Sequence, residues 1–147
     1  MTHEMAGETA ESIAELYRQN SAGDDPDPAY VEQLLATLEP CEVVLFACGW
    51  PDNGEKWGPL AQLTVTSRRI LDQRTHGAGV NAPLRQIALR DVLDVVERGR
   101  GGDVPFTTHA LVVDLCDGRS QEWEWLTNHQ VQPAAEAIRA AIDALGE

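Results

Sequence analysis

Four cationic side chains near the middle of the chain are the residues whose types and spacing favour ligand binding: Lys56, Arg68, Arg69 and Arg74. A guanidinium group binds phosphate or carboxylate through two parallel hydrogen bonds. One interpretation is therefore a site for an anionic small molecule or a lipid head group. The other is ordinary surface, either solvated or paired with the acidic N-terminal segment of the same chain. We favour the second, because exposed ion pairs usually contribute only about 0–1 kcal/mol and mark no site.

Two tryptophans, Trp50 and Trp57, flank a predicted turn of sequence PDNGEK. An Asn-Gly pair between apolar strands is a strong hairpin signal. The two indoles would form either an exposed platform for a partner or a cross-strand pair that stabilises the hairpin by about 0.5–1.5 kcal/mol. We favour the pair. We expect Trp123 and Trp125 to lie in the core, because they alternate with glutamates along a predicted strand.

No arrangement in the sequence is typical of catalysis or of metal binding. The four histidines are scattered singly, without a partner at metal-ligand spacing, and there is no nucleophile elbow or nucleotide-binding fingerprint. The spacings of Cys41, Cys48 and Cys116 match no zinc or redox pattern, so we expect each to be a small buried hydrophobe. We therefore predict a protein that is not an enzyme and uses neither a metal nor a cofactor.

The formal net charge of −13 argues against polyanionic partners. We expect no binding to nucleic acid, and peripheral contact with anionic lipid is disfavoured. The charge is uneven, however: residues 54–100 carry eight basic and five acidic side chains, +3 in total, whereas the rest of the chain is −16. There is no apolar run long enough to span a membrane and no signal peptide, which predicts a cytoplasmic protein without an integral membrane segment.

Two helices are predicted in the N-terminal part of the chain. Thr9 caps the first, over 9–19, and its apolar residues share one face. An acidic linker rich in glycine and proline follows. Asp27 then caps a second helix over 28–38 that begins with a proline. Both helices are expected to pack on a sheet, although the first is also a candidate for partner binding.

A third helix is predicted over 132–145, with Pro133 near its start and a glycine after its end. By composition we divide the chain into two parts. Residues 1–27 form an acidic N-terminal extension with a short helix and a linker, and 28–147 form the main domain.

The stretch 60–77 predicts two strands joined by a tight turn. Leu63 and Val65 alternate with Gln62 and Thr64, so we expect a half-buried hairpin with its polar face toward water. The segment 91–98 is ambiguous between a helical turn and a strand, and we favour a strand because its valines are β-branched. Strands are predicted over 42–50, 84–89, 91–98, 105–115 and 121–126. The chain is therefore expected to be mainly β, in the α+β class, with about seven antiparallel strands.

Three stretches resemble the bacterial branch of the pleckstrin-homology-like (PH-like, or GRAM-like) family. LEPCEVVLFACGW resembles its opening strand, GPLAQLTVTSRRIL its hairpin, and LRQIALRDVLDVVERG its later strand pair. With the C-terminal helix, the resemblance covers roughly residues 31–145. It implies a bent antiparallel sheet or partly open barrel of about seven strands, capped by the C-terminal helix, to which N-terminal helices are added.

The resemblance implies recognition rather than chemistry. We expect a non-catalytic binding or scaffolding module that recognises a protein partner or assembles with itself through exposed sheet edges. The alternative is binding of an anionic small molecule or lipid head group by the arginine-rich hairpin.

Overall fold

The computed structural model describes residues 8–51, 60–76, 80–81, 83–100 and 108–146. In these residues the helices are α1 (Ala10–Gln19), α2 (Pro28–Thr37) and α3 (Asn128–Leu145), and a short 3-10 turn is η4 (Leu89–Asp91). The strands are β1 (Val44–Pro51), β2 (Leu60–Thr66), β3 (Arg69–His76), β4 (Val80–Asn81), β5 (Arg85–Ala88), β6 (Val92–Arg100), β7 (Thr108–Leu115) and β8 (Ser120–Leu126).

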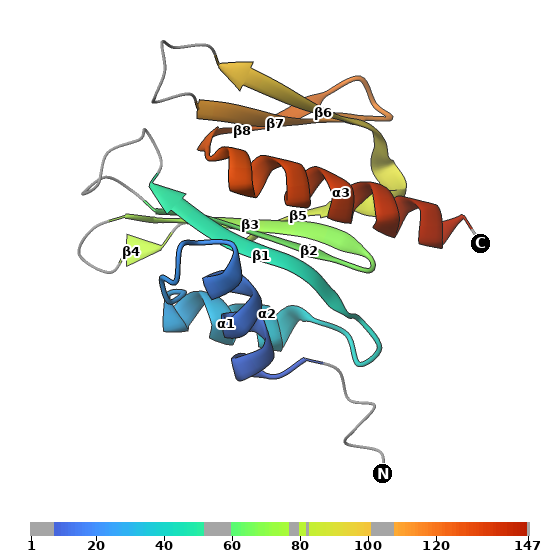
Figure 1. Cartoon of the computed structure of the whole chain (residues 1–147). Coiled ribbons are helices and arrows are strands. Elements are labelled where there is room, and N and C mark those ends of the chain that lie inside the picture. The colour runs from blue at the N-terminus through green and yellow to red at the C-terminus, as the bar shows by residue number, and fades with distance from the viewer. Residues whose placement is uncertain (1–7, 52–59, 77–79, 82, 101–107, 147) are drawn as a thin grey trace.

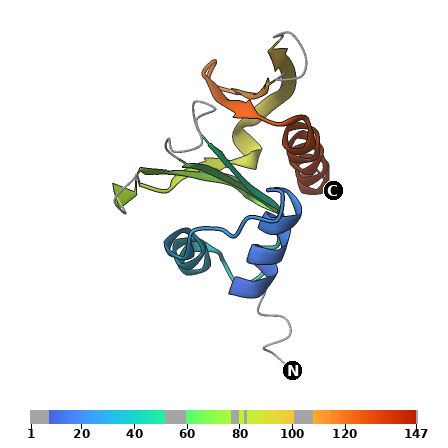
Figure 2. The same cartoon turned by 60° about the vertical axis from the view of Figure 1, so that its left-hand side comes forward.

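The strands form two antiparallel sheets that share the C-terminal helix (Figure 1). The first sheet has the order β1-β2-β3-β4, and β5 also pairs with β3. The second sheet has the order β6-β7-β8, and η4 carries the chain from the first sheet into the second. Helix α3 packs against strands of both sheets, whereas α1 and α2 lie on the opposite side of the first sheet (Figure 2).

Two apolar clusters follow from this layering. The larger one joins both sheets to α3 and includes Trp50, Leu63, Trp123 and Ile138. The smaller one joins the first sheet to α1 and α2 and includes Ile13, Tyr30, Leu34 and Leu71. Consequently both faces of the first sheet are buried.

The prediction of a mainly β structure of the α+β class, with helices at both ends, is confirmed. The expected partly open barrel is not confirmed. In the described part of the chain, the strands pair as two separate sheets, and no ladder closes them into a barrel.

Both N-terminal helices begin at the predicted caps. The Thr9 hydroxyl accepts a hydrogen bond from the Ser12 N–H (3.1 Å) ahead of α1, and the Asp27 carboxylate accepts one from the Ala29 N–H (3.0 Å) ahead of α2. Such caps satisfy N–H groups that have no partner within the helix. The ambiguous segment after η4 is a strand, β6, as predicted.

The C-terminal helix begins earlier than predicted, at Asn128. The Thr127 N–H donates to Gln130 Oε1 (3.1 Å) across the first turn. Pro133 therefore lies inside the helix, although it cannot donate a backbone hydrogen bond there. The prediction placed the start at Gln132, one residue before this proline, because proline is typical of first turns. Within the described ranges, no helix combines the length and apolar character needed to cross a membrane.

The polar face of the β2–β3 hairpin is buried, so the prediction of a half-buried hairpin is wrong. Gln62, Thr64 and Thr66 are each 0 % exposed. Buried polar groups require hydrogen-bond partners. The Thr64 hydroxyl pairs with the buried Tyr30 hydroxyl of α2, and the Thr66 hydroxyl donates to the Glu42 carboxylate. Alternation identified two different faces, but the N-terminal helices cover the polar one.

Gly49 of β1 is the point at which α1, β1 and α3 meet. Its N–H donates to Ser21 Oγ (2.9 Å), and its carbonyl accepts from Gln130 Nε2 (2.9 Å). A Cβ atom built on Gly49 would lie 1.7 Å from the hydroxyl oxygen of Tyr17. Only glycine fits beside the buried tyrosine, because the Cβ atom of any other residue would overlap the hydroxyl group and the adjoining ring edge of Tyr17.

Replacing Gly49 with alanine should therefore destabilise the fold. Overpacking of this kind costs about 1–3 kcal/mol, and chemical denaturation would measure the loss. Gly146→Ala at the end of α3 is the matched control, since a Cβ there would come no closer than 3.5 Å to its neighbours. We expect the control to change the free energy of unfolding by less than about 0.5 kcal/mol. Equal stability of both variants would contradict the close approach of Tyr17.

Candidate functional site

Arg69, at the start of β3, is held by its own protein. Its guanidinium donates to Glu42 from Nε (2.8 Å) and Nη2 (2.5 Å), to Gln86 Oε1 (2.7 Å) and to the Thr37 carbonyl (3.0 Å). The side chain of Arg69 is 16 % exposed and that of Glu42 is 0 % exposed. The donors that would bind an anion are thus engaged, and they join the end of α2 to β3 and β5.

The environment of Glu42 keeps this ion pair charged. Burial by itself raises the pKa of Glu42, but hydrogen bonds from Arg69, from the Thr66 hydroxyl and from the Glu39 N–H outweigh it and lower the pKa to about 2. Hydrogen bonding to Glu42 in turn raises the pKa of Arg69 above its ordinary value. The pair is a structural element inside the fold.

The other predicted cationic residues do not gather around Arg69. Arg68 lies in the β2–β3 turn, half exposed, and pairs with Glu39. Arg74 is five positions beyond Arg69 on β3, and side chains five apart on a strand point to opposite faces. Lys56 lies outside the described residues. Arg68 and Arg69 thus pair with acids that precede β1 and lie outside the acidic N-terminal extension. The Arg69 pair is inside the fold, whereas the favoured interpretation expected ordinary surface.

Trp50 is a core residue and is not available to an exposed platform. Its side chain is 2 % exposed, and its indole Nε1 donates to the Glu124 carbonyl of β8 (2.7 Å). This bond joins the edge of the first sheet to the second sheet. Trp123 is buried as predicted, at 1 % exposure. Trp57 and the side chain of Trp125 lie outside the described residues.

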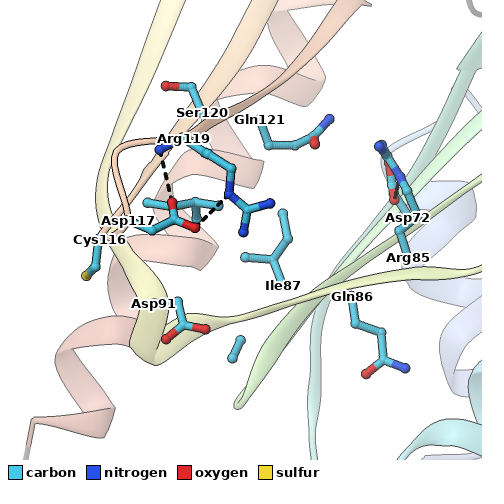
Figure 3. Close-up of a pocket in the computed structure, with 12 residues that line it drawn as sticks. Asp72, Arg85, Gln86, Ile87, Asp91, Cys116, Asp117, Arg119, Ser120 and Gln121 are labelled. Atoms are coloured by element: carbon cyan, nitrogen blue, oxygen red, sulfur yellow. Dashed lines mark hydrogen bonds and ion pairs between the residues drawn. The ribbon is translucent and has the colours of Figure 1, made fainter.

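A cleft of about 470 Å³ opens between the two sheets (Figure 3). One wall comes from β5 and η4, and the other comes from the β7–β8 turn. The Cys116 N–H donates to the Asp91 carbonyl (2.9 Å) and joins the two walls at one end. The lining residues are Asp72, Arg85, Gln86, Ile87, Ala88, Asp91, Leu115, Cys116, Asp117, Arg119, Ser120 and Gln121.

Asp72 of β3 connects the two sheets beside this cleft. Its carboxylate accepts from Trp123 Nε1 of β8 (2.8 Å) and from Arg85 Nε (2.8 Å), and Arg85 Nη2 makes a second bond to it. The side chain of Asp72 is 6 % exposed, whereas that of Arg85 is 50 % exposed. Hydrogen bonding to Asp72 raises the pKa of Arg85 above its ordinary value. Arg85 is therefore a fixed cation at the mouth of the cleft.

Arg119 points into the cleft from the opposite wall (Figure 3). Its Nε donates to Asp117 Oδ2 (2.6 Å) and its backbone N–H donates to Asp117 Oδ1 (3.0 Å). This N–H and then the guanidinium lower the pKa of Asp117. Gly118 has a φ of +88°, which permits the tight turn that brings the two side chains together. Both members of the pair are charged at neutral pH.

Asp91 is the remaining charged residue of the cleft. It is exposed, and among the described residues its carboxylate makes no hydrogen bond or ion pair. The lining therefore holds three aspartates and two arginines, and the two arginines are paired with Asp72 and Asp117. The uncompensated charge in the cleft is negative, and it lies at Asp91.

The sequence pattern does not reveal this cleft. Its residues come from β3, β5, η4 and the β7–β8 turn, which are far apart along the chain. One local signal is present in the sequence, since the Asp117-Gly118 pair is typical of a tight turn and the chain turns there. Nothing in the spacing of Asp72 and Arg85 shows that they meet, because their contact depends on the pairing of β3 with β5.

The described side chains of the cleft are suited to holding a ligand by charge and hydrogen bonds. The Ser120 hydroxyl donates to Asp114 (2.7 Å). Across the described residues, no three His, Cys, Asp or Glu side chains are grouped so that they could hold a metal ion.

Two of the three cysteines are exposed, which corrects the prediction that all would be buried. Cys41 precedes β1 and Cys116 follows β7, so each lies just outside a strand. Cys48, inside β1, is buried, and burial raises the pKa of its thiol. The prediction of burial from neighbouring apolar residues is therefore correct only for Cys48, the cysteine that lies inside a strand.

No protein-family description matches this chain, and no curated protein is similar enough to count as a relative.

Replacing Glu42 with glutamine should destabilise the protein at pH 7 far more than replacing Glu39. Glu42→Gln leaves the mostly buried Arg69 without its counter-ion, which costs about 3–5 kcal/mol. Glu39→Gln breaks the half-exposed pair with Arg68, which contributes about 0–1 kcal/mol. Urea denaturation of the two variants provides the comparison, and losses of similar size would contradict the structural role of Arg69.

The same pair predicts a pH dependence. Because the pKa of Glu42 falls from 4.5 to about 2 on folding, its stabilisation is complete above about pH 4.5 and is lost as the pH falls toward 2. Over this interval the wild type should lose roughly 3 kcal/mol through this group, and Glu42→Gln should not lose that part. Parallel stability profiles of the wild type and Glu42→Gln between pH 5 and 2 would argue against the ion pair.

Proposed function

We propose that this protein is a non-catalytic binding module that recognises a protein partner through the cleft between its two sheets. The observation that carries the proposal is an open cleft beside a sheet edge: β5 pairs with β3 on one side, and its other side borders the cleft. An edge strand offers unpaired backbone groups, and the adjoining cleft offers places for side chains. Such a combination is typical of peptide recognition.

A PH-like assignment is part of this proposal. It is supported by the order of elements, in which a first antiparallel sheet turns through η4 into a three-stranded sheet and ends in one helix packed on both. The quoted sequence stretches fall on β1, on the β2–β3 hairpin and on β5 to β6. Recognition by loops and edges is what that resemblance implies.

The alternative, an anion site at the arginine-rich hairpin, has less support. Arg69 is engaged by Glu42, and Arg68 is paired with Glu39. An anion would have to displace carboxylates that are tethered to the same chain. The geometry therefore favours the cleft over the hairpin.

A second candidate function is self-association. Leu93 is 71 % exposed and lies at a register shift of β6, an outer strand of the second sheet. We expect the contact to include the Leu93 side chain, because packing it against a second copy would remove apolar surface from water. Light scattering after size-exclusion chromatography should then show a dimer or larger species that becomes monomeric in Leu93→Lys. A wild-type monomer at high concentration would remove this candidate.

Protein recognition by the cleft is testable with a peptide library. Random twelve-residue peptides displayed on phage would be selected on the full chain, and enriched peptides would be tested on two variants. Gln121→Trp fills the cleft from its lining, whereas Gln132→Trp adds the same bulk at an exposed position of α3. We expect peptides whose Kd rises at least tenfold with Gln121→Trp and less than twofold with Gln132→Trp. Failure to enrich any peptide that depends on the cleft would overturn the proposal.

A further inference from the structure

The free side of β5 presents a defined set of backbone groups. The Leu89 N–H donates to the Arg68 carbonyl of the β2–β3 turn (3.0 Å), and β5 pairs with β3 without a register shift. Because backbone groups alternate in direction along an antiparallel strand, those of Gln86 and Ala88 point away from β3. These two residues offer an incoming chain two N–H donors and the Gln86 carbonyl, because the Ala88 carbonyl, at the N-cap of η4, accepts the first hydrogen bond of that turn.

The other outer strands are less suitable for pairing. The pairings of β1 and β6 shift register at Leu45 and Leu93, the pairing of β8 with β7 shifts between His109 and Leu111, and β4 has only two residues. Bulges of this kind disturb the regular spacing of backbone groups and protect sheet edges from association. In the described residues, β5 lines the cleft along its whole length, and its pairing with β3 has no register shift.

A strand added to β5 would direct every second side chain into the cleft. Ile87 and Leu115 provide half-buried apolar surface there. Beyond Ala88, the added strand would pass the exposed carboxylate of Asp91, with Asp117 on the facing wall (Figure 3). The two cleft arginines are already neutralised by their aspartate partners, so the electrostatic preference at this end is for a cation.

We infer that the cleft binds an extended peptide segment that adds to β5 as a further strand and places a lysine or arginine side chain against Asp91. The inference rests on the proposed function and specifies the chemistry of its partner. The net charge of −13 favours a basic partner over an acidic one at long range as well. An acidic segment would meet an unpaired carboxylate in the cleft and repulsion from the rest of the protein.

The backbone part of the inference is tested by removing one N–H group. Ala88 has a φ of −68°, which proline adopts without strain, and its N–H points away from β3, so Ala88→Pro should fold normally. Ala88→Val keeps the N–H and adds similar bulk. The probe is the tightest cleft-dependent peptide from the phage selection. We expect Ala88→Pro to raise its Kd at least tenfold and Ala88→Val to change it less than twofold.

Hydrogen exchange on the same complex gives an independent readout. Bound peptide should slow exchange of the Gln86 and Ala88 amides in the wild type at least tenfold. Unfolding midpoints of the wild type and both Ala88 variants confirm that the comparison is between folded proteins.

The charge part is tested with Asp91→Asn. Enriched peptides should carry a lysine or arginine at one fixed position, and Asp91→Asn should weaken their binding five- to tenfold at low salt. The difference should disappear at 0.5 M salt, where charges are screened. Glu136→Gln, which removes an exposed acid from α3 outside the cleft, is the matched control and should have less than a twofold effect.

The outcomes separate the two levels of the proposal. Cleft-dependent peptides that are acidic, or that bind Ala88→Pro or Asp91→Asn as well as the wild type, would overturn this inference and leave the proposed function standing. The absence of any cleft-dependent peptide would overturn both. Loss of binding in Ala88→Pro and in Asp91→Asn, with both controls unchanged, would support both.

Discussion

The burial of both faces of the first sheet is the constraint on which the rest of this structure depends. Helices α1 and α2 cover one face, and α3 with the second sheet covers the other. Each polar side chain on these strands must therefore find a partner inside the protein, because a buried polar group without one costs about 1–3 kcal/mol. The Tyr30–Thr64 pair and the Arg69–Glu42 pair are consequences of this covering. Gly49 is another, since it makes room for Tyr17 where α1 crosses β1.

The same constraint explains where a ligand has access. The arginine-rich hairpin lies in the covered part of the sheet, and the acids that precede β1 take up its charges. Cover is incomplete at β5, where the chain turns through η4 and the two sheets diverge. There the charged residues are arranged as two ion pairs and one exposed aspartate, and one side of the strand borders the cleft. The proposed binding of a peptide requires such an exposed, regular edge on a rigid support, and the ion pair of Asp72 with Arg85, together with the indole of Trp123, would supply that support.

The N-terminal helices contribute more than their sequence suggested. Asn20 donates to the carbonyl of Ala47 (3.3 Å), Ser21 accepts from Gly49, and Gln130 of α3 donates to the carbonyls of both Asn20 and Gly49. Side-chain hydrogen bonds thus join the end of α1 to β1 and to α3, which are distant from it in the sequence. The acidic character of this segment is compensated locally as well, since Arg18 pairs with Glu11, Glu15 and Asp25.

The sequence by itself determined the local structure. Helix caps at Thr9 and Asp27, the β2–β3 turn, the strand character of β6 and the turn at Asp117-Gly118 all depend on residues within a few positions of one another, and their chemistry is visible in the printed order. Only the tertiary structure decided which faces are covered and which distant residues meet. Alternation cannot reveal that α2 lies over Thr64, and spacing cannot reveal that Asp72 reaches both Arg85 and Trp123. Those contacts arise from strand pairing and from the packing of layers, which bring together segments that are remote in sequence. They also explain why Arg69, a candidate ligand-binding residue in the sequence, forms an interior ion pair with Glu42.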